Sequence, residues 1–356
     1  MEPFEYPILA HVDLDAFYAA VEELEHPGLS GRPLVVGGDP HGRGVVATAN
    51  YEARRYGIQS AMSSAEALRR CPHATFLRPD GNLYRRYSRR VWSAIREVVP
   101  TVERTGLDEG YLGVGEVARN FREARRIAEA VQSAVRGATD LSCSLGVGTC
   151  KVVCKVASDR RKPGGITVVR PGREAAFLAP LALRRLPGVG PRADERMRAA
   201  GLRTVGDLAA LDDAALRALL PGKVGRVLRD RARGKDPREL EHGVENISIG
   251  HEETFPRDVS DRERLYEELR RMALRVAEHL VEGGKAARTV TTKVRYPDFA
   301  IRSRSTTLAA GTDDGAQIGE IACRLLDRAL ADRPGALRLV GVTVSKIETH
   351  RQLVLG

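Results

Sequence analysis

The sequence predicts an α+β multidomain protein, and three observations lead to that prediction. Over residues 1–170, apolar runs typical of strands alternate with segments of amphipathic helical spacing. Residues 175–235 instead carry short helices broken by Pro-Gly pairs, with no strand signal. After a polar stretch at 236–246, strand and helix patterns return, which indicates a second α+β unit. A length of 356 residues fits two to four domains.

The period of the apolar residues places each element of the first unit. Residues 82–99, for example, repeat apolar side chains every three to four positions, which is the helical period. Lysine, proline and two glycines at 162–165 end the last helix of this unit. The expected elements are a strand running into a helix at 8–20, strands at 33–38 and 44–50, helices at 51–56, 82–99 and 119–138, a strand at 141–148 and a helix at 151–158.

The second unit reads in the same way. Alternating residues predict a pair of neighbouring strands, and two long segments have the helical period. The residues from His350 onward look like a tail. The expected elements are a segment from Ser248 to Phe255, a helix at 261–283, strands at 287–296 and 300–308, a helix at 313–331 and a strand at 338–346.

Composition narrows the range of functions. The formal net charge of +10 fits a polyanionic partner such as nucleic acid. The five cysteines are odd in number and form no C-x-x-C pair, which argues against a disulfide framework or a zinc knuckle. Cys150 and Cys154 lie four apart, and we expect buried thiols there in preference to a metal site. Without a secretory signal or a long apolar run, the sequence predicts a cytoplasmic protein with no membrane span.

Two acidic clusters, 95 residues apart, lie in short apolar runs. In the first, Asp13 alternates with apolar neighbours, so a strand would project it from one face of a sheet. In the second, Asp108 and Glu109 are adjacent, as expected at a strand end or tight turn. Either cluster alone reads as solvated loop acids. Brought together, the three carboxylates would hold two Mg²⁺ ions, the arrangement used for in-line phosphoryl displacement.

Two further segments carry groups suited to phosphate. A helix opens after a strand near Thr48, and its Tyr51 and Arg54 are neighbours on one helix face. Lys162, followed by proline, offers a second cation that could reach the same phosphates. The alternative for Tyr51 and Arg54 is that they simply lie on the surface of a helix. The alternative for Lys162 is a charge at a helix end that complements the helix dipole.

A helix-hairpin-helix signature lies at Leu186–Arg192, followed by a helix through Met197 to Leu202. Its glycines, Gly188 and Gly190, would let backbone N–H groups approach a DNA phosphate without reading sequence. A purely structural turn is the main alternative.

Cations alternate along the paired strands of the second unit. Lys293 and Arg295 share one strand face, and Arg302 and Arg304 alternate similarly on the next strand. We expect these four side chains to form the wall of a groove that tracks phosphates. A solvated sheet face is the alternative.

Four runs taken together resemble the Y-family DNA polymerases, most closely their DNA polymerase IV (DinB) branch. They are residues 12–22, 47–54, 107–112 and 162–165, and the likeness extends over essentially the whole chain. The resemblance implies a right-hand polymerase that copies damaged DNA with low fidelity and lacks a proofreading exonuclease. The implied domains are a palm (1–16 and 80–169), small fingers (17–79), a thumb containing the helix-hairpin-helix (170–236), a linker (237–246), an α+β little finger (247–349) and a clamp-binding tail (350–356).

The resemblance also implies roles for single residues. Asp13, Asp108 and Glu109 match the catalytic metal-binding carboxylates, and the Leu14 carbonyl matches a backbone metal ligand. Tyr18 matches the aromatic residue that excludes a 2′-hydroxyl. The triphosphate contacts correspond to Thr48, Tyr51, Arg54 and Lys162.

The partners implied are primer-template DNA, a dNTP, two Mg²⁺ ions (with Mn²⁺ as an alternative) and a sliding clamp, for a protein that works as a monomer. The clamp-docking peptide would use Gln352, Leu353 and Leu355. The sequence departs from the family pattern at Gly106, Gly113, Cys150 and Gly356, and at the last of these the clamp motif often has one more apolar residue. Gly106 and Gly113 flank the second acidic cluster where serine and Leu-Asp are usual, and Cys150 replaces the usual asparagine at a helix start.

Two rival functions remain open from the residues alone. A nucleotidyl cyclase-like palm also uses paired carboxylates, but it would need neither a DNA hairpin nor a clamp tail. A non-catalytic DNA-binding regulator would have no reason to keep the acids and the phosphate-binding cations. A primer-extension assay with Mg²⁺ separates the three.

Overall fold

The computed structural model describes residues 6–241 and 247–349. The chain divides into two compact units, Met1–Pro40 with Gly44–Gly243, and His41–Arg43 with Val244–Gly356. The boundary between the units falls inside the predicted linker.

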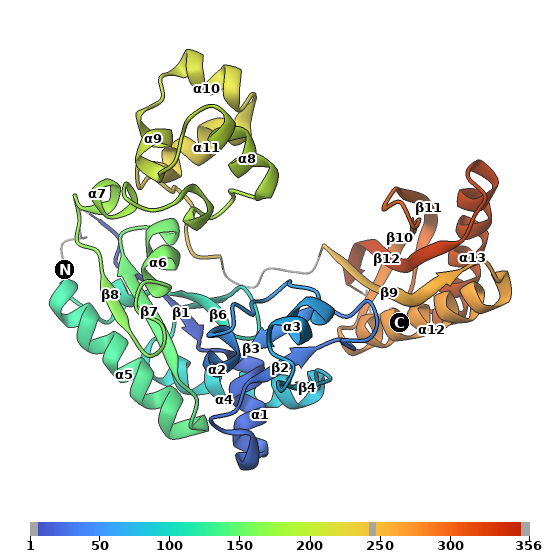
Figure 1. Cartoon of the computed structure of the whole chain (residues 1–356), viewed down its shortest axis with the longest axis horizontal. Coiled ribbons are helices and arrows are strands. Elements are labelled where there is room, and N and C mark those ends of the chain that lie inside the picture. Colours follow the sequence, from blue (N-terminus) through green and yellow to red (C-terminus); the bar gives the residue numbers. More distant parts are fainter. Residues whose placement is uncertain (1–5, 242–246, 350–356) are drawn as a thin grey trace, which may run out of the picture. The chain divides into compact units, whose positions relative to one another are not determined.

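The first unit is built on a five-stranded sheet with the strand order β5-β6-β1-β7-β8 (Figure 1). β1 is antiparallel to both of its neighbours, and β7 pairs in parallel with β8. The strands are β1 Leu9–Leu14, β5 Val102–Arg104, β6 Glu109–Leu112, β7 Cys143–Gly148 and β8 Ile166–Val168, and the helices packed with them are α1 Phe17–Glu25, α4 Gly81–Val98, α5 Phe121–Thr139 and α6 Lys151–Ser158.

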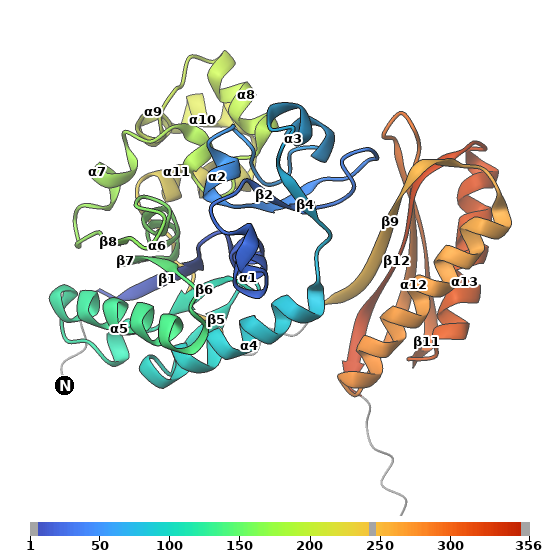
Figure 2. The same ribbon diagram turned by 60° about the horizontal axis from the view of Figure 1, so that its bottom comes forward.

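The alternation of β1 separates a core face from a polar face. Val12 and Leu14 belong to the main core, which they share with residues of α4 and α5 such as Trp92 and Val131. α4 and α5 run side by side along this face (Figure 2). Side chains at odd positions of β1 point toward α6, where His11 bonds Ser158 and Leu9 packs against Cys154. Asp13 is therefore presented on the α6 side, as the strand period predicted.

A smaller three-stranded sheet, of order β3-β2-β4, corresponds to the expected fingers. One face of this sheet has a small core of its own, which includes Val35, Ile58 and Cys71. Phe17 and Val21 of α1 lie in the main core together with Leu34 and Val36 of β2, so α1 packs between the two sheets. The elements are β2 Leu34–Gly37, β3 Val46–Ala49, α2 Tyr51–Arg54, α3 Ser64–Arg70 and β4 Thr75–Leu77.

Residues 170–236 form a helical segment, as predicted from its short, interrupted helices. α8 begins at Pro191 directly after Gly190, and it ends at Ala199, before the predicted Leu202. The hairpin ahead of it is held by Arg231, whose Nη1 donates to the Pro187 carbonyl at 3.1 Å. The helices are α7 Glu174–Leu178, α8 Pro191–Ala199, α9 Val205–Ala210, α10 Asp213–Leu219 and α11 Lys223–Ala232, with a 3₁₀ turn at Leu183–Arg185. Two further 3₁₀ turns lie outside this segment, at Pro27–Leu29 and Val114–Glu116.

The start of α6 is capped from a distance. Cys150 occupies the N-cap position without a side-chain cap bond, and its Sγ donates to the Gly234 carbonyl at 3.3 Å. Asp236 performs the missing function, because its Oδ2 accepts from the Val152 N–H at 3.1 Å. The departure from asparagine at 150 is thus compensated by a carboxylate at the other end of the helical segment.

The first half of the predicted linker packs on the first unit. The Glu241 N–H donates to Glu103 Oε2 at 2.7 Å, and Glu103 also pairs with the buried Lys151 at 2.5 Å. Leu240 packs against a cluster that contains Leu9. Residues 237–241 of the predicted linker are therefore held against the first unit by partners far away in the sequence. Residues 242–246 lie outside the described residues.

The second unit is a four-stranded antiparallel sheet of order β11-β10-β12-β9, with α12 and α13 together on one face (Figure 1, Figure 2). Its core is formed by apolar residues from both helices and from alternate strand positions, for example Leu269, Leu326 and Val342. The elements are β9 Ser248–Val259, α12 Arg262–Glu282, β10 Lys285–Arg295, β11 Ile301–Thr312, α13 Gly315–Asp332 and β12 Leu337–Thr349.

Candidate active site

The two acidic clusters meet at one end of the five-stranded sheet. Asp13 and Glu109 are directly opposite residues of the antiparallel strands β1 and β6, so their side chains project from the same face. Next to them, the Leu14 N–H donates to the Asp108 carbonyl at 2.9 Å. Strand pairing thus brings together four residues that sequence analysis placed in one metal site.

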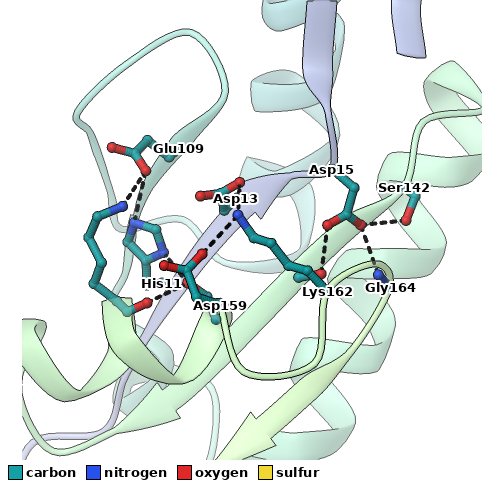
Figure 3. Close-up of polar contacts among 11 residues, drawn as sticks. His11, Asp13, Asp15, Glu109, Ser142, Asp159, Lys162 and Gly164 are labelled. Carbon is teal, nitrogen blue, oxygen red and sulfur yellow. Dashed lines mark hydrogen bonds and ion pairs between the residues drawn. The ribbon is translucent and has the colours of Figure 1, made fainter. Parts of the chain in front are cut away.

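Each of two acids is paired with a lysine. Lys162 Nζ lies 2.5 Å from Asp13 Oδ1 and 3.0 Å from Asp159 Oδ1 (Figure 3). Lys155 pairs with Glu109. Among residues 6–241 and 247–349, no three histidine, cysteine or acidic side chains converge in a geometry that could hold a metal ion. The three carboxylates therefore lie near one another without converging on one point, and two of them are paired with lysine ammonium groups.

The electrostatics of the carboxylates nevertheless suit a cation. Burial raises the pKa of Asp13 to about 6, and the Glu109 charge adds to the rise while Lys162 opposes it. Burial, followed by repulsion from Glu109, also raises the pKa of Asp108. Desolvated carboxylates that repel one another gain from a divalent cation, and hard oxygen donors are the ligands that Mg²⁺ prefers. The donor set therefore fits the predicted ions.

His11 belongs to the same face, although the sequence analysis did not single it out. Its Nδ1 lies 2.9 Å from Ser158 Oγ, and its Nε2 lies 3.7 Å from Glu109 Oε2. Burial, with help from Lys155 and Lys162, holds the pKa of His11 well below its usual value. The imidazole is thus a neutral neighbour of Glu109.

The start of α2 carries the expected phosphate-binding pair. The Asn50 side chain caps the helix by accepting from the Ala53 N–H at 2.9 Å. The Arg54 guanidinium lies over the Tyr51 ring, 4.9 Å from its centroid, and its Nε donates to the Ala49 carbonyl. This stack holds Tyr51 and Arg54 together on one helix face, as predicted.

The two residues line a cleft of about 770 Å³ together with Asp15, Ser142 and Pro163. The Tyr51 hydroxyl is buried without a hydrogen-bond partner, and burial raises the pKa of this phenol to about 12. An unsatisfied donor in a cleft between cations is a natural contact for a phosphate oxygen. Thr48 lies three residues before Tyr51, on β3 opposite Val36.

Tyr18, on α1, is held by an aromatic platform. Its ring stacks on that of Tyr84, with centroids 4.1 Å apart and an interplanar angle of 12°. The Tyr84 hydroxyl donates to the buried Glu22 at 2.6 Å, which fixes the platform. The sequence contains no local signal for this stack, because the two rings are 66 positions apart.

Of the two departures at glycine, the one at Gly113 has a steric reason. A Cβ at Gly113 would come within 2.9 Å of Thr101, whose carbonyl accepts from the Gly113 N–H. The Gly106 N–H bonds the Glu109 carbonyl across the turn that precedes β6. The two glycines therefore flank β6, and only Gly113 lies where a side chain would not fit.

The predicted cationic groove wall is wrong as a single face. Lys293 and Arg295 lie opposite Ser303 and Ile301 on one face of the sheet. Arg302 and Arg304 lie opposite Val294 and Thr292, which belong to the face that packs on the helices. Strand register separates the four cations into two pairs. Lys293 also pairs with Glu252, and Arg304 with Asp332, so a carboxylate accompanies one member of each pair.

The hairpin glycines lie where the sequence placed them. Gly188 has a positive φ of 101°, a conformation that favours glycine, and Gly190 is the N-cap of α8. The clamp-docking residues Gln352, Leu353 and Leu355 lie outside the described residues. None of the helices in the described ranges is long and apolar enough to cross a membrane.

Comparison with known proteins decides the family. Residues 12–159 match the impB/mucB/samB family, residues 246–355 match its C-terminal domain, and residues 184–236 match the thumb domain of DNA polymerase-iota. DNA polymerase IV of Alkalilimnicola ehrlichii is 42% identical over 352 residues, which cover 98% of each chain. DNA polymerase IV of Streptomyces coelicolor is 40% identical over 97% of this chain and 72% of its own.

This chain belongs to the Y-family DNA polymerases, in the DinB branch. The resemblance inferred from four short runs is thereby confirmed. Solved structures agree, since a Y-family Dbh–Dpo4 chimera aligns with a TM-score of 0.87 at 25% identity, over 96% of this chain and all of its own. DinB from Sulfolobus solfataricus aligns with a TM-score of 0.66 at the same identity and coverage.

The polymerase has the right-hand fold that was expected, with a helix-hairpin-helix thumb and a little-finger domain. It is a DNA-directed DNA polymerase of the translesion class. Neither a cyclase-like palm nor a non-catalytic regulator accounts for relatives that match across nearly the whole chain.

Proposed function

We propose that this polymerase extends a primer 3′ end on a DNA template by a two-metal mechanism, with low fidelity and without proofreading. The observation that carries the proposal is the direct pairing of Asp13 with Glu109 across β1 and β6, with Lys162 beside them. The carboxylates of Asp13, Asp108 and Glu109 and the Leu14 carbonyl would hold two Mg²⁺ or Mn²⁺ ions. Bound there, the ions would neutralise charge on the attacking and leaving oxygens.

The protein's own groups would bind and orient the nucleotide. Thr48, Tyr51, Arg54 and Lys162 would hold the triphosphate, with the guanidinium able to bind it bidentately. The Tyr18 ring, braced by Tyr84, would lie against the sugar and leave no room for a 2′-hydroxyl. Such a site accelerates the reaction mainly by positioning and charge compensation.

Primer extension tests this mechanism. With Mg²⁺, a labelled primer should lengthen according to the template, and excess EDTA should stop extension while leaving DNA binding measurable. A primer with a mismatched 3′ end should not shorten on incubation without dNTPs. Extension in EDTA would refute the metal mechanism, and primer shortening would refute the absence of proofreading.

We further propose that the DNA contacts run through the thumb hairpin at Gly188 and Gly190 and through the little-finger cations Lys293 and Arg295, which share one face of the sheet. Because these groups meet backbone phosphates, binding would depend little on sequence. The enzyme would work in the cytoplasm as a monomer. Five free, buried cysteines are in keeping with a reducing compartment.

The tail at 350–356 would dock on a sliding clamp. Deleting residues 351–356 should leave extension without clamp unchanged and abolish stimulation by the clamp, because Gln352, Leu353 and Leu355 would supply a polar anchor and two apolar contacts. So small an interface implies a dissociation constant on the order of micromolar. Extension assays with and without clamp measure this, and Leu353→Ala in the full chain is the milder variant. Equal stimulation of truncated and full-length chains would place the clamp contact elsewhere.

A further inference from the structure

Asp15 lies just past the end of β1, two residues beyond Asp13, and it is buried at 4% exposure. Its carboxylate accepts three hydrogen bonds. Ser142 Oγ donates to Oδ2 at 2.6 Å, Ser144 Oγ donates to Oδ1 at 2.8 Å, and the Gly164 N–H donates to Oδ2 at 2.8 Å (Figure 3). The backbone N–H of Asp15 also donates to the Ser142 carbonyl. A carboxylate so fully engaged within the protein has little capacity left for a metal ion.

The third of these bonds reaches the turn that carries Lys162. Gly164 has a positive φ of 69°, and it follows Lys162 by two residues. On its other side, the Gly164 carbonyl accepts from Gln132 Nε2 at 2.9 Å, and the same nitrogen donates to the Cys143 carbonyl at 2.8 Å. Asp15 and Gln132 therefore hold the turn from two directions.

This arrangement links two parts of the site that are far apart in the sequence. Asp13 and Asp15 lie on one short piece of backbone at the end of β1, and each contacts the Lys162 turn. Asp13 meets the ammonium of Lys162, whereas Asp15 meets the backbone two residues later. The Lys162 turn is thus held to the end of β1 twice, once through the flexible lysine side chain and once through its own backbone at Gly164.

We infer that Asp15 is a positioning residue: through Ser142, Ser144 and Gly164 it fixes the Lys162 turn, so that the ammonium is placed to bind the incoming nucleotide's triphosphate. This inference rests on the proposed role of Lys162. A lysine side chain has four rotatable bonds, so its anchoring backbone largely determines where its charge is held. Small displacements of a binding group reduce binding and rate steeply.

A double-mutant cycle tests the inference without any chemical turnover. The dNTP dissociation constant is measured with Mg²⁺ on a primer-template whose primer lacks the 3′-hydroxyl, for the wild type, Asp15→Asn, Lys162→Ala and the double variant. Each single change should weaken dNTP binding about tenfold, and the double variant should be no weaker than Lys162→Ala alone. Primer-template affinity should stay unchanged in all four proteins.

Two further measurements separate positioning from general destabilisation. Hydrogen exchange of the segment containing Gly164 should speed up in Asp15→Asn, because its N–H loses a charged acceptor. Asn120→Ala is the matched control, since it removes an acceptor of two backbone N–H bonds at the start of α5 and should not alter dNTP affinity. If Asp15→Asn fails to fold, Ser144→Ala removes one donor and should weaken dNTP binding about threefold, again only when Lys162 is present.

The outcomes separate the proposed role of Lys162 from the positioning role of Asp15. If Lys162→Ala leaves dNTP affinity unchanged, the proposed role of Lys162 is wrong. If Lys162→Ala weakens binding but Asp15→Asn does not, or if the two losses multiply in the double variant, the positioning role of Asp15 is refuted. Exchange at Gly164 that stays at the wild-type rate in Asp15→Asn refutes it equally.

Discussion

Replacing Asp108 with asparagine is expected to abolish primer extension and, at the same time, to make the metal-free protein more resistant to heat at neutral pH. Loss of a metal-binding carboxylate should remove several kcal/mol of transition-state stabilisation, which corresponds to roughly a 10³-fold slower reaction. Primer-template affinity should change little, since the duplex is held by contacts elsewhere. Single-turnover extension and a DNA-binding titration measure these two effects.

The stability gain follows from the direction of the pKa shift. Burial and the neighbouring Glu109 raise the pKa of Asp108 in the folded protein. A raised carboxyl pKa means that the folded state binds the proton more tightly than the unfolded state does. The stabilising effect of this proton is complete below the unfolded-state pKa and disappears as pH rises through the folded-state pKa. At neutral pH the ionised carboxylate therefore costs stability, and asparagine removes that cost.

Thermal melts in EDTA should show the gain at pH 8, and it should shrink toward acid pH. Glu129→Gln, on the exposed surface of α5, is a suitable control and should change neither activity nor this pH dependence. Near-normal extension by Asp108→Asn would remove its catalytic assignment. A lower melting temperature at pH 8 would instead contradict the electrostatic account of the site.

Replacing Tyr18 with alanine is expected to admit ribonucleotides. Because the Tyr18 ring is stacked on Tyr84, it cannot move away from a 2′-hydroxyl, and the two groups would overlap. Such overpacking costs about 1–3 kcal/mol, so its removal should raise the relative efficiency of rNTP insertion by roughly one to two orders of magnitude. The efficiencies of dNTP and rNTP insertion, compared in the wild type and the variant, give the ratio.

Tyr18→Phe is the matched variant, because it keeps the ring and removes the hydroxyl. It should discriminate as the wild type does. An unchanged ratio in Tyr18→Ala would show that another residue excludes the ribose. Phe17, the adjacent aromatic residue, is poorly suited to that role, since it is 2% exposed and belongs to the main core.

Local motifs were enough to propose roles for the carboxylates, the Tyr51–Arg54 pair and Lys162, because each proposed role depends on a few consecutive residues. The period of β1 was enough to place Asp13 on one face, and strand pairing then positioned Glu109 opposite it. The antiparallel strands of the second unit were also predictable, but their register was not. A pairing that sets Arg304 against Thr292 depends on the turn between the strands and on the whole core below them.

Partners far apart in the sequence could not be predicted from it. The stack of Tyr18 on Tyr84 and the bonds from Asp15 to Gly164 both join segments that meet only after the sheet has formed. The cap that Asp236 supplies to α6 is a similar case. Cys150 in place of asparagine indicated that the start of α6 is capped differently, but the residue that compensates, Asp236, lies 86 positions later.

The docking of residues 236–241 on the first unit limits how far the second unit can travel. Glu241 is tied to Glu103, and β9 begins at Ser248, so seven peptide links join the two fixed points. Fully extended, they can span no more than about 25 Å. With so short a connection, the effective concentration of the second unit near a duplex bound by the first unit would be on the order of millimolar. The proposed contact of the second unit with DNA would then be an intramolecular step and not a separate association.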